Sequence, residues 1–237
     1  MDVQKTGLFV QTTPSTPRDA GHDWDEEART LFARLNIDCG GNRDKYRNVD
    51  AVYKHPTTGA SLYIGNQTAA RSESVLVGEK IFHIVNCQDA SAANFFEADP
   101  RFAYKRFPVS HWWRQEGVDT HAGVLAFFEN GCHAWIADAL ESGHNVMVHC
   151  LAGAHRAGTT GVSFMMREGR FDATTAIKLA KYQRPIVDPF GQLHELLTRL
   201  EAAYAAQGRI PVPPEGDFGA AADAHAHAAA AAAPAPA

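Results

Sequence analysis

The chain has 237 residues, 45% of them hydrophobic and 21% charged, which is ordinary for a globular protein with a single sizeable core. The formal net charge of -5 gives no general attraction to nucleic acid or to an anionic membrane, so we expect neither as a partner and assign any anion binding to a local site. The sequence has no apolar stretch long enough to cross a bilayer and no secretory leader at its start, which favours the cytoplasm, or the nucleus, as its location.

Two segments precede the main domain that the sequence predicts. Residues 1–22 are rich in Thr, Pro, Asp and Gly without a period, which indicates a flexible arm. Residues 23–58 are predicted to form an accessory helix and a loop. Apolar residues recur there at helical spacing behind Asp23, a candidate cap, and a polar stretch follows from Cys39. We therefore expect the first strand at residue 61.

Strands and helices alternate through residues 59–207, the predicted catalytic domain. The predicted strands cover 61–66, 81–87, 104–110 and 145–150, and the predicted helices cover 68–80, 120–143, 158–169, 172–183 and 190–207. This alternation predicts an α/β fold with a central, mostly parallel sheet flanked by helices, in which ligands bind at the carboxyl ends of the strands. Residues 208–237 are rich in Ala and Pro and are predicted to be a disordered tail.

The most informative stretch is VHCLAGAHRAGTTG, residues 148–161, where a predicted strand, a glycine-containing turn and a helix follow one another. Such a turn gathers backbone N–H groups into a cup at a helix N-terminus, which binds phosphate and favours a thiolate over a thiol. Cys150 is therefore the candidate nucleophile, and the planar guanidinium of Arg156, six positions on, suits two phosphate oxygens. The predicted phosphate-binding residues are Leu151, Ala152, Gly153, Ala154, His155 and Arg156.

Three other interpretations fit parts of this stretch. In the first, Cys150 is a small buried hydrophobe at the end of a strand, as free cysteines often are. In the second, residues 153–160 form a nucleotide-binding loop, but Thr159 stands where that loop requires lysine. In the third, His149, Cys150 and His155 bind a metal ion, but adjacent strand residues point to opposite faces. We therefore expect neither a metal nor a cofactor.

The stretch HCLAGAHR fits the signature HCxxGxxR, and in it the chain resembles the cysteine-dependent protein tyrosine phosphatases, in particular their compact dual-specificity branch. The stretches LYIGNQTAARS, HIVNC and KYQRPIVDPFGQLHELLTRLE are also similar to that branch, so the resemblance spans about residues 60–204. It implies a protein tyrosine phosphatase-like fold, a covalent cysteinyl-phosphate intermediate and a phosphoprotein substrate. It also implies a shallower pocket than that of the larger tyrosine-specific enzymes.

Two residues depart from the family pattern. Ala157 stands where the family usually has Ser or Thr, whose hydroxyl donates to the cysteine sulfur and helps the thiolate to leave. Slow hydrolysis of the cysteinyl-phosphate is therefore expected unless Thr159 or Thr160 supplies that donor. His155 replaces a small or hydroxylated residue, and we expect it to add bulk and a titratable group at the rim of the pocket.

The reaction also needs a carboxylic acid across the pocket from the sulfur, because the leaving oxygen must be protonated. Family members carry an aspartate on a loop about thirty residues before the cysteine. Asp119 lies 31 positions before Cys150, just ahead of a predicted helix, and is the candidate acid, with Glu116 in reserve. Capping that helix is the competing role for Asp119.

Further residues are expected near the nucleophile. His149 and Thr159 are predicted to lie beside it without touching the phosphate. Cys87, at the end of a strand, is either a small core residue or, as in some relatives, a thiol that protects the oxidised nucleophile through a disulfide. Of Trp112 and Trp113, we expect one in the core and one exposed, where it can stack on a phosphotyrosine or sugar ring; core packing explains the pair equally well.

The sequence thus predicts a phosphatase that acts on phosphotyrosine, and as a second class on phosphoserine and phosphothreonine, in proteins. Two alternatives stay open. One is a phosphoglucan phosphatase, since some glucan phosphatases share this fold, although the chain has no glycine directly before Arg156 and no evident carbohydrate-binding module. The other is an adaptor that holds phosphoproteins and turns them over slowly, which Ala157 favours.

Overall fold

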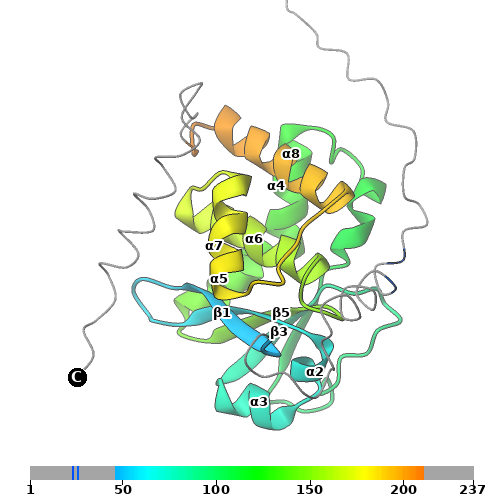
Figure 1. Ribbon diagram of the computed structural model, residues 1–237, viewed down its shortest axis with the longest axis vertical. Coiled ribbons are helices and arrows are strands. Elements are labelled where there is room, and N and C mark those ends of the chain that lie inside the picture. Colours follow the sequence, from blue (N-terminus) through cyan, green and yellow to red (C-terminus); the bar gives the residue numbers. More distant parts are fainter. Residues whose placement is uncertain (1–22, 24–25, 27–45, 211–237) are drawn as a thin grey trace, which may run out of the picture.

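The computed structural model describes residues 23, 26 and 46–210, and its fold is a sheet with helices on both faces (Figure 1). Within these residues the strands are β1 (Val49–Lys54), β2 (Ser61–Gly65), β3 (Ile81–Asn86), β4 (Ala103–Arg106) and β5 (Asn145–His149). The helices are α2 (Gln67–Ala70), α3 (Glu73–Gly78), α4 (His121–Phe128), α5 (Ala134–Glu141), α6 (Arg156–Gly169), α7 (Ala173–Gln183) and α8 (Gln192–Ala206). A 3₁₀ helix η1 (Val109–Arg114) precedes α4, and a π-helical turn η2 (Glu129–His133) joins α4 to α5.

In the described part of the chain, the strand order of the sheet is β1-β2-β5-β3-β4. Strands β2, β5, β3 and β4 run parallel, and β1 at one edge is antiparallel to β2. This confirms the predicted α/β fold with a mostly parallel sheet. Parallel strands end at the same edge of a sheet, so the loops after β5, β3 and β4 meet there, and the loop after β5 takes the central place.

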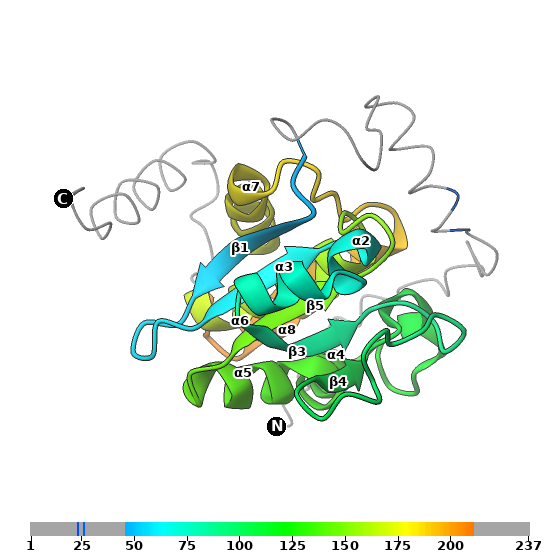
Figure 2. The same cartoon turned by 90° about the horizontal axis from the view of Figure 1, so that it is seen from below.

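The two faces of the sheet are covered unequally (Figures 1 and 2). Helices α2 and α3 cover one face, and α4 to α8 cover the other. Met147 of β5 packs into the smaller cluster with Leu76 of α3, whereas its neighbours Val146 and Val148 pack into the larger cluster. Because successive strand residues face opposite sides, a central strand buried on both faces is an unbroken apolar run.

Strand β1 lies where the sequence predicted a loop. A bulge between Ala51 and Tyr53 shifts its register against β2. The bulge breaks the period-two alternation, so Val49 and Val52 are both buried although they are three positions apart. Asp50 is buried as well. The bulge and the buried Asp50 together remove the alternation of apolar and polar residues by which a strand is recognised in a sequence.

Three other predicted elements differ in detail. The predicted helix over 68–80 divides into α2 and α3, because the Ser72 side chain caps α3 and accepts a hydrogen bond from the Val75 N–H. The predicted helix over 120–143 continues from α4 to α5 through the π-helical turn. The predicted strand over 104–110 ends at Arg106, and the chain turns into η1 at Pro108, which has no N–H for a sheet.

The predictions for the two ends of the chain fall largely outside the described residues, which exclude the arm, most of the accessory helix and residues 211–237 of the tail. At residue 26 the backbone N–H donates to the Asp23 carboxylate over 3.0 Å, as expected of a helix cap. None of the helices in the described part of the chain is long and apolar enough to cross a membrane.

Candidate active site

Cys150 is the first residue after β5, and a tight loop connects it to α6. It is 2% exposed, and its sulfur accepts a hydrogen bond from the Gly153 N–H at 3.3 Å. Gly153 has a φ of +68°, and a Cβ there would lie 2.5 Å from the Gly65 carbonyl oxygen. Glycine is required at this position, because both the backbone angle and the available space disfavour a side chain.

The four backbone carbonyls of residues 151–154 are each held from outside the loop. The hydrogen bonds are Gln67 N to Leu151 O (3.1 Å), Tyr46 Oη and Arg184 Nη2 to Ala152 O (2.9 and 3.2 Å), Arg184 Nε to Gly153 O (2.9 Å), and Asp188 N to Ala154 O (3.1 Å). In a trans peptide group the C=O and the N–H point in opposite directions. The N–H groups of residues 152–155 therefore face the inside of the loop and form a cup for an oxyanion.

Arg156 begins α6 and is 4% exposed, so its side chain is folded into the protein and does not extend into solvent. Burial, with the nearby charges of Arg106 and Arg156, lowers the pKa of His149 to about 3. His149 is therefore neutral at physiological pH, and it lies in the core directly before Cys150. An oxyanion in the cup would meet backbone N–H groups at the N-terminus of α6.

The two hydroxyls that follow the signature are used inside α6. Thr159 donates to a backbone carbonyl one turn earlier at 2.8 Å, and Thr160 does the same at 3.0 Å. A hydroxyl has one proton to donate, so neither side chain donates to the Cys150 sulfur in this arrangement. With Ala157 beside the arginine, the hydrogen bond that the structure gives to the sulfur comes from Gly153.

His155 does not lie at the rim of the pocket, where the sequence placed it. It is 3% exposed, its Nδ1 donates to the Asp188 carbonyl at 2.8 Å, and its ring meets the edge of Phe190 with centroids 4.8 Å apart. The ring packs against the neighbouring segment that carries Asp188 and Phe190. His155 therefore anchors the loop and adds no titratable group to the rim.

The role of capping α4 belongs to Thr120, whose hydroxyl accepts a hydrogen bond from the Gly123 N–H at 3.0 Å. Asp119 is exposed, and within the described residues its carboxylate makes no hydrogen bond or ion pair. Glu116 is also exposed. The structure therefore removes the competing role of Asp119, although no hydrogen bond in the described residues joins either carboxylate to the loop after β5.

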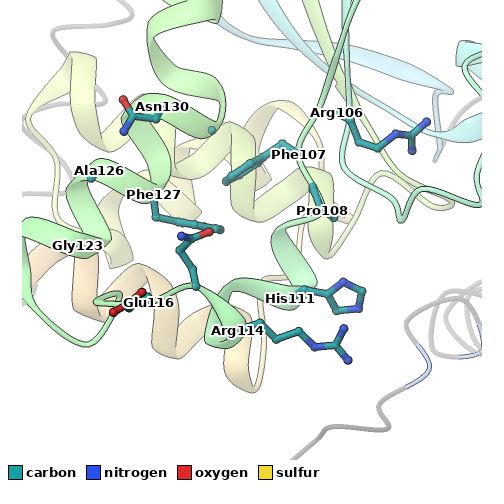
Figure 3. Close-up of a pocket in the computed structure, with 12 residues that line it drawn as sticks. Arg106, Phe107, Pro108, His111, Arg114, Glu116, Gly123, Ala126, Phe127 and Asn130 are labelled. Atoms are coloured by element: carbon teal, nitrogen blue, oxygen red, sulfur yellow. The ribbon is translucent and has the colours of Figure 1, made fainter.

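A cavity of about 560 Å³ lies between the end of β4 and α4, and Glu116 is part of its lining (Figure 3). Phe107 and Phe127 pack together inside it, with ring centroids 4.9 Å apart. The side chains of Arg106, His111 and Arg114 extend away from these two rings in Figure 3, and the Arg106 guanidinium donates to the Asp89 and Ala92 carbonyls at 2.6 and 2.8 Å. The lining does not include Cys150, Arg156 or Asp119, so this cavity lies apart from the loop after β5.

Cys87 lies beside the strand that carries the nucleophile, since its N–H donates to the His149 carbonyl at 2.9 Å. It is fully buried, and its thiol donates to the Thr160 hydroxyl oxygen at 3.4 Å. Burial raises the pKa of the Cys87 thiol to about 12. In the described part of the chain Cys87, Cys132 and Cys150 are free thiols.

The tryptophan pair is divided as the sequence predicted. Trp112 is 5% exposed and packs in the core, whereas Trp113 is 39% exposed. The Arg114 guanidinium lies over the Trp113 ring, 4.8 Å from its centroid. Trp113 and Arg114 therefore form a surface that is both aromatic and basic, next to the cavity that Arg114 lines.

Sequence reasoning missed three residues that shape the loop, which are Tyr46, Asp50 and Arg184. Arg184 is 1% exposed, and its Nη1 lies 2.7 Å from Asp50 Oδ2. Patterns of period 2 or 3.6 report on local neighbours, and these contacts join segments more than a hundred positions apart. The one local signal is that Arg184 precedes Pro185 in a stretch similar to the phosphatase family.

Three comparisons with known proteins agree with this geometry. Residues 62–201 match the family model "Dual specificity phosphatase, catalytic domain". The chain is 29% identical over 153 residues to human dual specificity protein phosphatase 9, covering 62% of the chain and 38% of that protein. It is 29% identical over 155 residues to mouse dual specificity protein phosphatase 19, covering 65% of each. A crystal structure of a mouse putative dual specificity phosphatase matches the fold with a TM-score of 0.54 and 23% identity, covering 74% of the chain and 99% of that protein. The matched region is about two fifths of the length of the first of these relatives.

Proposed function

The chain belongs to the dual specificity phosphatase family, and we propose that it hydrolyses phosphotyrosine and, as a second class, phosphoserine and phosphothreonine in proteins. The observation that supports this most directly is the hydrogen bond from Gly153 to the Cys150 sulfur, inside a loop whose carbonyls are all held outward. The fully assembled cup is the arrangement that stabilises both a thiolate and a phosphate. On composition we place the protein in the cytoplasm or nucleus.

In the first chemical step the Cys150 thiolate attacks phosphorus and the bond to the ester oxygen breaks. Asp119 gives its proton to that oxygen, and the alcohol or phenol leaves. The backbone N–H groups and the Arg156 guanidinium hold the phosphoryl oxygens, so the protein contributes position and charge stabilisation. The product on the protein is a covalent cysteinyl-phosphate.

In the second step water attacks the cysteinyl-phosphate. The Asp119 carboxylate takes a proton from that water, the sulfur–phosphorus bond breaks, and the thiolate returns with release of inorganic phosphate. The leaving thiolate is stabilised by the Gly153 N–H. Ala157 gives it no hydroxyl donor, so this step limits turnover. Neither step draws on a metal or a cofactor.

The experiment is to incubate the wild type and Cys150→Ser with phosphotyrosine peptides, phosphothreonine peptides and a phosphorylated glucan, and to measure phosphate release. We expect release from the peptides by the wild type and none by the variant. Equal release by both proteins would refute the nucleophile, and release from the glucan alone would replace the substrate class.

A slow-turnover adaptor is the second candidate, and one observation favours it. Thr159 and Thr160 commit their hydroxyls to the backbone, so neither of them compensates for Ala157. An adaptor would release about one equivalent of dephosphorylated peptide per protein in a burst, keep the phosphoryl group on Cys150, and then release almost no more of either product. An enzyme would continue at a steady rate, so a burst experiment beside steady-state turnover separates the two.

A further inference from the structure

A buried ion pair lies behind the phosphate-binding loop. The Arg184 Nη1 donates to Asp50 Oδ2 and to the Arg47 carbonyl, each at 2.7 Å. The Tyr46 ring lies 5.2 Å from the centre of the guanidinium. Asp50 balances a charge that would be costly to bury alone, and the three contacts fix the plane of the guanidinium.

The remaining edge of that guanidinium holds two successive peptide groups of the loop. Arg184 Nε donates to the Gly153 carbonyl at 2.9 Å, and Nη2 donates to the Ala152 carbonyl at 3.2 Å. A rigid fork can bind both oxygens at once, whereas an ammonium group is a single point. The fork thus sets the orientation of both peptide groups together.

Tyr46 holds one of the same carbonyls from a second direction. Its hydroxyl donates to the Ala152 carbonyl at 2.9 Å and accepts a hydrogen bond from Asn66 Nδ2 at 2.6 Å. Burial raises the pKa of the Tyr46 hydroxyl, so it keeps its proton and remains a donor. The Ala152 carbonyl belongs to the peptide group whose N–H bonds the Cys150 sulfur.

We propose that Tyr46 and Arg184, with Asp50 as the counter-ion, are positioning residues of the phosphate site, and that they aim the Gly153 and Ala154 N–H groups at the thiolate and the bound anion. We call these three residues the brace. A loop carbonyl that the brace no longer holds can rotate inward and present its negative end to the anion. The brace also strengthens the inward N–H groups, because hydrogen bonds that share a peptide group polarise one another. The inference rests on the proposed use of this loop for phosphate.

The brace extends the site beyond the part of the chain that the family model covers. Tyr46 and Asp50 precede the matched residues 62–201, and Arg184 lies near their end. Residues 46–50 therefore belong to the catalytic unit, although the domain predicted from the sequence begins at residue 59. A protein shortened to that boundary would keep the signature and lose two members of the brace.

The deciding variant is Tyr46→Phe, which removes one hydroxyl and keeps the ring. Tyr63→Phe is the matched control, because its hydroxyl contacts Glu79, 3.2 Å away on the side of α3. Two measurements apply, neither of which requires turnover: the affinity for inorganic tungstate by calorimetry, and the pH dependence of Cys150 alkylation by iodoacetamide. We expect tungstate to bind about three- to tenfold more weakly to Tyr46→Phe, as for loss of one hydrogen bond, and alkylation to shift to higher pH.

Arg184→Lys, made in the full chain, measures the contribution of the guanidinium to anion binding independently of Tyr46. Lysine keeps a positive charge beside Asp50 and cannot bridge both carbonyls, so we expect a weakening of tungstate binding of about tenfold or more. If that variant does not fold, Tyr46→Phe decides alone. Equal tungstate affinity and equal alkylation profiles for Tyr46→Phe and Tyr63→Phe would overturn the proposal. Tungstate binding without any turnover by the wild type would count against the proposed function and leave the brace intact.

Discussion

The Gly153 amide nitrogen lies 3.3 Å from the Cys150 sulfur, and this hydrogen bond exists because the backbone at Gly153 turns into the left-handed region. A thiolate gains more from such a donor than a thiol does, since hydrogen bonds to charged groups are about twice as strong as neutral ones. The bond therefore links the shape of the loop to the nucleophilicity of the sulfur.

The first prediction concerns Gly153→Ala. The added Cβ meets the Gly65 carbonyl and must also adopt a positive φ, so we expect the loop to shift, and phosphatase activity to fall by about a hundredfold or more, the loss typical of a displaced catalytic group. Gly143→Ala is the control, because Gly143 has a φ of +82° with nothing within 4 Å of its added Cβ. Steady-state rates and thermal melting of both variants test this. Equal activity in the two would contradict it.

The second prediction concerns Ala157→Ser. The serine hydroxyl would give the departing thiolate a second donor, which the threonines of α6 do not supply. We expect steady-state turnover to rise about tenfold, as for a hydrogen bond to a charged group, and the initial burst to shrink. Rapid-quench measurement of the dephosphorylated product, the alcohol or phenol that leaves in the first step, shows both effects. An unchanged burst with an unchanged steady rate would mean that breakdown of the cysteinyl-phosphate does not limit turnover.

The sequence was informative wherever the chemistry depends on near neighbours. Cys150 and Arg156 are six positions apart on a strand–turn–helix, and the observed loop and α6 have that form. The apolar runs of β2, β3 and β5 likewise predicted a central, mostly parallel sheet. In each case the pattern that carries the prediction lies within a few residues, so composition and spacing are sufficient to recognise it.

The sequence was uninformative where distant segments decide the outcome. No hydrophobic period around Arg184 indicates that it would be buried against Asp50, 134 positions away. His155 was misplaced for the same reason, because its partners Asp188 and Phe190 come from another segment. Strand β1 was missed because its bulge removes the alternation that marks a strand.

The third prediction concerns the general acid. Asp119→Asn should lower kcat/KM, which reports formation of the cysteinyl-phosphate, by about a hundredfold on a substrate with a poor leaving group, because the leaving oxygen then departs without a proton. The kcat/KM on an aryl phosphate with an acidic phenol should fall much less, since its leaving group needs no proton. Glu116→Gln is the comparison, and we expect it to keep both rates. A larger loss of activity on the poor leaving group in Glu116→Gln than in Asp119→Asn would make Glu116 the general acid in place of Asp119.

The fourth prediction concerns oxidation by peroxide. The Cys150 thiolate would attack peroxide to form a sulfenic acid with release of hydroxide, and the Cys87 thiolate would then attack that sulfur, forming a disulfide and releasing a second hydroxide. We expect a dithiol to restore the wild type after peroxide treatment and to restore Cys87→Ser poorly. Cys132→Ser is the control, because Cys132 is also a buried thiol whose pKa is raised by burial.

The pH dependence of this protection follows from the pKa of the Cys87 thiol, which burial raises to about 12. Only the thiolate attacks, and below pH 12 its fraction grows about tenfold with each pH unit, so disulfide formation should accelerate by that factor between neutral and mildly alkaline pH. Intact mass measured over time after a peroxide pulse reports the disulfide as a loss of two hydrogens. Equal recovery of the wild type and Cys87→Ser at both pH values would make Cys87 a core residue without a redox role.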